Sequence, residues 1–303
     1  MRYGMPYQGS KSRIADWVVG NLPSAPVLVD IMCGGGAVSH AALLSGKYGR
    51  VVLNDVNGMA DVFVRAVRGE YADYSFVPDR EQFNAMKGSD PLVSLLYSFG
   101  NDRNTYLWSR TLEPVKVAAS RMLCAPSLSE RRRYWRVFCR ALREYVEGYD
   151  EIPERLERLQ GLQGLERLQR LQRLQELQGL ISLERLQGLQ GLQGLERLQG
   201  SCADYRDVEI PSDAIVYVDP PYADTNCRAY DGFDFDAFHA WLDSVPNLTV
   251  VSEYTCPPHC VQVAEREHHT TFSASSNKLP RVERLFVPER QLDEYQERMG
   301  VMC

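Results

Sequence analysis

The chain has 303 residues, of which 44% are hydrophobic and 24% are charged, and its formal net charge is -6. These values fit a globular protein of one large or two small domains and argue against a uniformly basic nucleic-acid binder. The sequence contains no apolar run of membrane-spanning length and no signal-peptide core, so we expect an intracellular protein without a membrane partner. The eight cysteines are scattered, which is typical of a reducing compartment.

The N-terminal segment predicts a turn followed by a helix. Gly9 and Ser10 precede an amphipathic run over residues 14–22. We expect Ser10 to cap this helix and Lys11 to project from its first turn. By itself the pattern indicates only the start of a helix.

A strand, a glycine turn and a helix come next. Val27–Ile31 is an apolar strand, residues 34–36 are all glycine, and Ala37–Leu44 is a helix of small residues. This order forms the first half of a nucleotide-binding βαβ unit. Glycines allow a ligand to approach the backbone, and a helix N-terminus favours a carboxylate or phosphate. Because the spaced GxGxxG pattern is absent, we favour a cofactor smaller than a dinucleotide.

The second strand ends in an acidic residue. Residues 51–54 are predicted to form a strand that is closed by Asp55, and a helix is expected over residues 57–68. Asp55 lies about 20 residues past the glycine turn, the spacing at which a carboxylate meets the hydroxyls of a ribose. The sequence therefore predicts a ribose-binding carboxylate at this strand end.

Residues 69–150 are mostly helical in pattern, and we interpret them as an insert in the α/β core. Helices are expected over residues 91–99, 114–124 and 129–148. Residues 97–106 read as a polar and aromatic loop.

Basic residues gather between residues 100 and 145 of this region. They are Arg103, Arg110, Lys116, Arg121, Arg131, Arg132, Arg133, Arg136, Arg140 and Arg143. Between residues 100 and 145 these ten face four acidic residues, and ten minus four leaves a local charge of roughly +6. The excess indicates either a nucleic-acid-binding patch or a solvated helix face.

Residues 151–200 form a low-complexity insertion, in which leucine occupies every third position from Leu156 to Leu198. A 3₁₀-helix would align these leucines on one face, whereas an α-helix would wind them around the rod. We predict a 3₁₀-like rod whose apolar stripe allows self-association, with a surface linker as the alternative.

The sequence Asp219-Pro220-Pro221-Tyr222 follows a buried strand, Ile215–Val218. The two prolines end the strand, so a carboxylate, a rigid carbonyl and an aromatic ring meet where α/β sheets bind ligands. This set suits a flat, amine-bearing ring that stacks on Tyr222 and donates hydrogen bonds to Asp219 and the Pro220 carbonyl. The alternative is a strand-ending turn with a solvated Asp219.

The pattern of the C-terminal region completes an α/β fold. Its expected elements are a helix over 236–245 and strands over 249–252, 270–273 and 282–287. A polar loop over residues 274–281 carries Lys278. Cys256, His259 and Cys260 have a metal-like spacing, but without a second pair they are a weak zinc signal, so no metal is expected.

The order of these motifs resembles that of the Dam-type DNA adenine methyltransferases. These are S-adenosylmethionine-dependent enzymes with a Rossmann-like, seven-stranded α/β core and a helical target-recognition insert. The resemblance covers residues 1–148 and 201–290. It implies a catalytic core of residues 1–68 and 201–303 and a recognition insert of residues 69–150, with residues 151–200 left as the repeat insertion.

The resemblance assigns residues to the cofactor and to the reaction. The cofactor-binding residues that it implies are Tyr7, Lys11, Asp30, Gly34, Gly36, Asp55, Asp204, Tyr205 and Asp219. The catalytic residues that it implies are Asp219, Pro220 and Tyr222. It places Arg103 and Asn104 in the recognition loop. The basic pattern adds Lys116, Arg131, Arg132 and Lys278 as DNA-binding candidates.

The implied activity is methylation of the exocyclic amine of adenine in double-stranded DNA, after the base is flipped out of the duplex. Such an enzyme would act in the cytoplasm of a bacterial or phage-infected cell. Methylation of another planar amine, in cytosine or a protein glutamine, is an alternative. A non-catalytic DNA-binding scaffold is a second. Residues 31–33 depart from the family pattern, and no β-hairpin is evident in the recognition region, so no target sequence is inferred.

Overall fold

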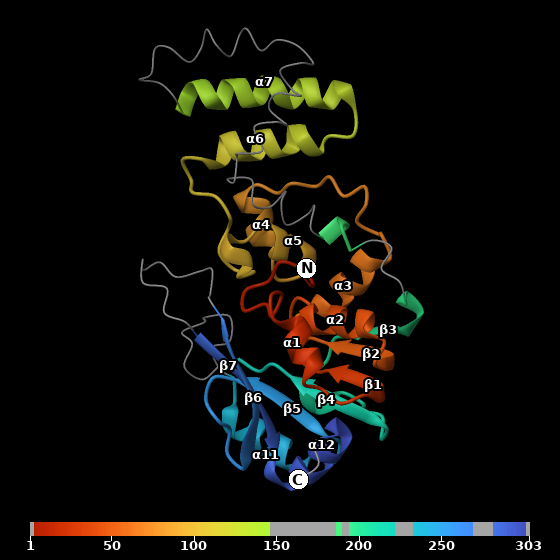
Figure 1. The fold of residues 1–303 in the computed structure, drawn as a ribbon. Helices are drawn as coiled ribbons and strands as arrows, with labels where there is room; N and C mark the ends of the chain where they lie inside the picture. The colour runs from red at the N-terminus through yellow and green to blue at the C-terminus, as the bar shows by residue number, and fades with distance from the viewer. Residues whose placement is uncertain (1–2, 146–185, 190–193, 222–232, 269–280, 301–303) are drawn as a thin grey trace. The chain divides into compact units, whose positions relative to one another are not determined.

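The computed structural model describes residues 3–145, 186–189, 194–221, 233–268 and 281–300 (Figure 1). The chain divides into two compact units. One consists of Met1–Met5, Gly9–Arg68 and Leu189–Cys303, and the other of Pro6–Gln8 and Gly69–Gly188. We call them the core unit and the helical unit. Within the described ranges, no helix is long and apolar enough to cross a membrane.

The core unit is built on a seven-stranded sheet with the order β3-β2-β1-β4-β5-β7-β6. Its strands are β1 (Ala25–Asp30), β2 (Tyr48–Asn54), β3 (Leu198–Ser201), β4 (Ala214–Val218), β5 (Thr249–Glu253), β6 (Cys260–His268) and β7 (Arg281–Pro288). Strands β1 to β5 pair in parallel, and β7 is antiparallel to both β5 and β6. The strand order reverses between β1 and β4, and such a switch point is where open α/β sheets bind ligands.

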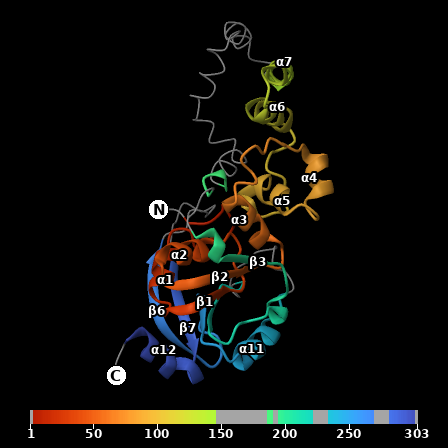
Figure 2. The same cartoon turned by 90° about the vertical axis from the view of Figure 1, so that its right-hand side faces the viewer.

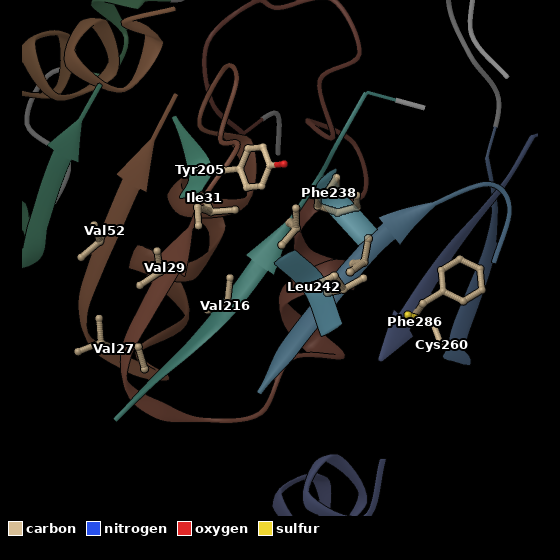
Figure 3. Packing of buried hydrophobic residues seen from close by; sticks show 13 residues of the cluster. Val27, Val29, Ile31, Val52, Tyr205, Val216, Phe238, Leu242, Cys260 and Phe286 are labelled. Carbon is tan, nitrogen blue, oxygen red and sulfur yellow. The ribbon is translucent and has the colours of Figure 1, made fainter. Parts of the chain in front are cut away.

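Helices cover both faces of this sheet. They are α1 (Ala15–Gly20), α2 (Ala37–Ser45), α3 (Met59–Val67), α11 (Phe235–Ser244) and α12 (Leu292–Met299), with the 3₁₀ turns η2 (Leu195–Arg197), η3 (Tyr205–Asp207) and η5 (Glu289–Gln291). In Figure 2, α11 lies on the opposite side of the sheet from α1 and α2. Phe238 and Leu242 of α11 share one apolar cluster with valines of β1 and β4 (Figure 3). Covering on both faces explains why these strands are near-continuous apolar runs.

The helical unit contains four described α-helices. They are α4 (Arg80–Met86), α5 (Pro91–Leu96), α6 (Glu113–Cys124) and α7 (Leu128–Tyr145), with the 3₁₀ turn η1 (Phe99–Asn101). Asp79 and Asp90 cap α4 and α5 by accepting backbone N–H hydrogen bonds. Phe138 and Ala141 of α7 are buried in a small cluster with residues of α6, which joins the two helices into a pair.

The structure corrects the prediction for the N-terminal turn. Helix α1 has Ile14 at its N-cap, without a side-chain hydrogen bond, so Ser10 does not cap it. Lys11 precedes the helix and is only 7% exposed. The local pattern could not show this burial, because the partners of Lys11 come from distant strands.

The predicted leucine rod lies mostly outside the described residues. At its C-terminal end, Leu195–Arg197 forms one short 3₁₀ turn, and Leu198 then enters β3 opposite Val51 of β2. The predicted boundary between residues 200 and 201 therefore falls inside a strand of the core sheet. The correction has a tertiary cause, because β2 offers the last triplet a strand to pair with.

The edge strand β6 was missed in the sequence. Its pairing with β7 is irregular between Gln262 and Ala264, and this irregularity breaks the alternation that marks a strand. Its second half is charged, as is common at a sheet edge. The strand predicted over 270–273 and the loop with Lys278 lie outside the described residues.

Candidate active site

Polar side chains converge at the carboxyl edge of the parallel strands. Asp30 ends β1, Asp219 directly follows β4, and Ser252 lies near the end of β5. Strand β7 enters at the same edge, because it runs antiparallel to β5, and it brings Glu283 there. The site is thus assembled from four strands that are neighbours in the sheet.

Lys11 lies within a buried ionic cluster, which we define as Lys11, Asp219 and Glu283. Its Nζ is 2.7 Å from Asp219 Oδ1 and 3.6 Å from Glu283 Oε1. Lys11 and Glu283 are buried, whereas Asp219 keeps 21% of its side chain exposed. Burial lowers the pKa of Lys11, but the two carboxylates outweigh it and hold the pKa above its usual value. The ammonium group therefore stays charged at neutral pH.

Asp30, at the end of β1, is hydrogen-bonded to the first turn of α2. Its Oδ2 accepts hydrogen bonds from the backbone N–H and the Oγ of Ser39, at 3.2 and 2.6 Å. Its Oδ1 has no hydrogen-bond partner among the residues that the structure describes. Burial raises the pKa of Asp30 to about 7, a shift that the Ser39 hydrogen bond opposes and Asp219 increases.

The glycine turn is held in a conformation that side chains would disturb. Gly34 and Gly36 have φ angles of 48° and 66°, a region that favours glycine. A Cβ on Gly36 would also lie 2.8 Å from the Phe63 ring. The N-terminal segment contacts this turn, because the Met5 N–H donates to the Gly35 carbonyl at 2.7 Å.

Asn54 and Asp55 lie at the end of β2, and Asn54 connects this end to the residues that follow β1 and β3. Asn54 donates to the carbonyl oxygens of Ile31 and Ala203, at 3.0 and 2.9 Å. Asp55 is 7% exposed, and its Oδ1 accepts from the Asn57 N–H at 2.8 Å. Sequence reasoning missed the role of Asn54, although a polar residue ending an apolar strand was the available signal.

Asp204 and Tyr205 lie at the turn after β3. The Asp204 carboxylate binds the Arg206 guanidinium through both oxygens, at 2.8 and 2.9 Å. The ring of Tyr205 belongs to the buried apolar cluster, 5.9 Å from Phe238 and 5.2 Å from Trp241. Their contact with a cofactor stays a prediction.

A cavity of about 350 Å³ lies beside Pro220. Its lining consists of Pro220, Phe235, Phe238, His239, Glu253, Thr255, Cys256, Pro257 and Pro258. Apolar and aromatic walls with a few polar groups suit a flat organic ring. Tyr222, the expected stacking residue, lies outside the described residues.

The recognition-loop candidates lie in the helical unit. The Arg103 guanidinium lies 5.6 Å from the ring centroid of Tyr7, which also belongs to this unit. Asn104 accepts hydrogen bonds from the Lys87 ammonium through its backbone and side-chain oxygens. Both candidates are therefore tied into the loop by other residues of the unit.

The basic residues of the helical unit divide into buried and exposed sets. Lys116 is only 7% exposed, and this burial argues against the predicted contact with DNA. Arg131 donates to the Ala125 carbonyl at 2.9 Å and thus supports the end of α6. The exposed arginines of α7 are Arg132, Arg133, Arg136, Arg140 and Arg143. At 3.6 residues per turn these five fall within an arc of about 100°. We call them the α7 arginine face.

The cysteine-rich segment after β5 forms no recognisable metal centre. Within the described ranges, no group of three or more His, Cys, Asp and Glu side chains could hold a metal ion. His259 instead pairs with Asp243 at 3.0 Å.

Comparison with known families places this geometry in context. Residues 7–90 match the family model of the D12 class N6 adenine-specific DNA methyltransferases. This range contains Lys11, Asp30, the glycine turn and Asp55, whereas Asp219 lies beyond it. No curated protein matches the chain. Residues 7–90 are therefore similar to the D12 class of N6 adenine-specific DNA methyltransferases, and Lys11 of this range contacts the Asp219-Pro220 motif at the switch point.

Proposed function

We propose that the chain transfers a methyl group from S-adenosylmethionine to the exocyclic amine of adenine in double-stranded DNA, after the base leaves the duplex. The contact of 2.7 Å between Lys11 and Asp219 carries this proposal. It joins a residue of the matched segment to the catalytic motif 208 residues away. Lys11 and the Asp219-Pro220 motif, each a weak indication of function in the sequence, therefore belong to the same site.

The chain's own acceptors would activate the target amine. The adenine amine is a poor nucleophile, because its lone pair is delocalised into the ring. The Asp219 carboxylate and the Pro220 carbonyl would accept its hydrogens and favour a lone pair localised on nitrogen. The cofactor supplies an electrophilic methyl group on a sulfonium. Asp219 is also the acceptor that we propose for the proton lost from the amine. Positioning and fixed dipoles would account for most of the acceleration.

The residues at the switch point fit this cofactor. The glycine turn lies at the N-terminus of α2, where an anionic group is favoured, and Gly34 in this turn is half-buried. Asp55 supplies a carboxylate at the end of β2 for ribose hydroxyls. Asp30 Oδ1, without a described partner, could accept a hydrogen bond from a cationic group.

The cavity beside Pro220 would receive the flipped base. Its Phe235 and Phe238 walls and the adjacent Pro220 carbonyl combine apolar surface with an acceptor, as recognition of a flipped base requires. The α7 arginine face would bind phosphates of the DNA, since exposed arginines neutralise the backbone without reading sequence. Stacking by Tyr222 remains part of the proposal.

A labelling experiment tests this function. The purified chain is incubated with DNA and S-adenosylmethionine carrying a labelled methyl group, and the DNA is digested to nucleosides. We expect the label in N6-methyladenine. Label in cytosine, or in protein glutamine, would transfer the proposal to those substrates. Calorimetry that detects no cofactor binding would favour the non-catalytic scaffold.

A further inference from the structure

Glu283 is a buried carboxylate for which the proposed chemistry has no role. It is 1% exposed and lies in β7, the strand antiparallel to β5. Its Oε1 accepts a hydrogen bond from Ser252 Oγ at 2.6 Å and lies 3.6 Å from Lys11 Nζ. Glu283 is thus fixed from β5 while it faces the ammonium group.

Lys11 therefore faces carboxylates from two strands. Asp219 comes from the end of β4, and Glu283 comes from β7. A buried ammonium needs a compensating charge, and Asp219 alone provides one. The second carboxylate gives the cluster of one ammonium and two carboxylates a formal charge of -1. In a weakly solvated site, such an excess favours a cation close by.

We propose that Glu283 is a positioning residue for methyl transfer, which holds Lys11 against Asp219 and gives the cluster a negative charge that favours a cationic cofactor over its neutral-sulfur product. This inference rests on the proposed use of S-adenosylmethionine. The cofactor carries a sulfonium, whereas S-adenosylhomocysteine, which remains after methyl loss, carries a thioether. Glu283 acts on the reaction through Lys11, and it touches neither substrate in this account.

A purely structural role for Glu283 makes a different prediction. If Glu283 serves only to tie β7 to β5 through Ser252, its replacement lowers stability but treats the cofactor and its product alike. The ratio of the two affinities separates these roles, because a partly unfolded sample lowers the apparent number of sites for both ligands. Positioning also predicts a loss of kcat without a matching change in the KM for DNA.

The test uses the full chain and three variants. Glu283→Gln keeps a hydrogen-bonding side chain of similar size and removes the charge. Glu283→Asp keeps the charge on a shorter side chain. Ser252→Ala removes the hydrogen bond to Glu283 and leaves every charge of the cluster in place, so it is the matched control. Calorimetry measures binding of S-adenosylmethionine and S-adenosylhomocysteine, and single-turnover assays measure methylation.

We expect Glu283→Gln to shift the affinity ratio about fivefold toward S-adenosylhomocysteine and to lower kcat about tenfold. Glu283→Asp should have the same ratio of affinities for the two ligands as the parent chain. Ser252→Ala should also have this ratio, while its kcat falls about threefold. If Glu283→Gln does not fold, an unchanged kcat in Ser252→Ala together with an altered ratio in Glu283→Asp overturns the proposal. An unchanged ratio in folded Glu283→Gln also overturns it. Failure of the parent chain to bind either ligand would instead refute the proposed cofactor.

Discussion

The two units of the chain differ in where their functional candidates carry charge, which is buried in the core unit and exposed on α7 of the helical unit. The core unit buries Lys11 between Asp219 and Glu283, whereas the helical unit exposes the α7 arginine face. A buried charge acts through specific partners, and removal of one partner leaves another uncompensated. Exposed arginines act collectively on a polyanion, and salt screens them. Single substitutions should therefore have large effects in the core unit, and only combined ones should matter on α7.

The largest expected effect comes from Asp219→Ala. The substitution removes the side-chain acceptor for the target amine, and we expect kcat to fall about a thousandfold or more. Glu283 would still compensate Lys11, so the fold should persist, as circular dichroism can verify. Asp219→Asn is the matched control, because it keeps the shape and loses the charge. Activity of the alanine variant within about tenfold of the parent would contradict the assignment.

Asp55→Ala tests whether the carboxylate at the end of β2 binds the cofactor. We expect S-adenosylmethionine affinity to fall about tenfold to a hundredfold, because a hydrogen bond to a charged group is lost, while DNA affinity changes little. Asp55 also accepts from the Asn57 N–H, so Asp55→Asn serves as a control that retains this local contact. A titration with unchanged cofactor affinity would move the ribose contact elsewhere.

The comparison predicts a collective effect on α7. Replacement of Arg132, Arg136 and Arg140 by Gln should weaken DNA binding and reduce the slope of log K against log salt by up to about 3. Arg131→Gln is the matched control, because Arg131 donates to the Ala125 carbonyl. It should leave the salt slope unchanged. Equal slopes for the parent and the triple variant would show that this face does not bind phosphates.

Asp30→Asn tests the cost of a buried carboxyl group. The folded-state pKa of about 7 exceeds the ordinary value near 4. Folded protein therefore holds this proton more tightly, and the free energy of unfolding falls as pH rises from about 4 to about 7. In the Asn variant, the free energy of unfolding should not show this decrease between about pH 4 and about pH 7, which is on the order of a few kcal/mol at most. Urea unfolding of both proteins at several pH values measures the free energy of unfolding of each. If this free energy changes with pH in the same way in both proteins, the raised pKa of Asp30 is contradicted.

The smallest effect is expected within the repeat. Removal of whole triplets between residues 156 and 185 should leave methylation within about twofold of the parent, because it keeps the last triplet in β3. Removal of Leu198–Gly200 is the contrasting variant. It would bring Arg197 to the position of Gly200, where a Cβ meets Val64 at 3.1 Å. We expect this variant to melt at a lower temperature, and equal melting temperatures would show that β3 tolerates any triplet.

The sequence by itself determined the local parts of the catalytic core. The glycine turn, the acid at the end of β2 and the Asp219-Pro220 turn were visible, because each depends on neighbouring residues. The match over residues 7–90 agrees with the family that these motifs indicated. Even the buried strands β1 and β4 were found within a few residues of their ends, since covering on both faces produces continuous apolar runs.

Only the tertiary structure decided how these parts meet. Lys11 was predicted to project from the first turn of a helix, yet it precedes the helix and is buried beside Asp219 and Glu283, which come from segments far away in the sequence. Lys116 read as a DNA-binding cation and is buried in the helical unit. Leu198 read as part of a repeat and became a sheet strand because β2 lies beside it. Local patterns encode backbone preference, whereas burial and charge pairing depend on contacts between distant segments, which a single sequence does not display.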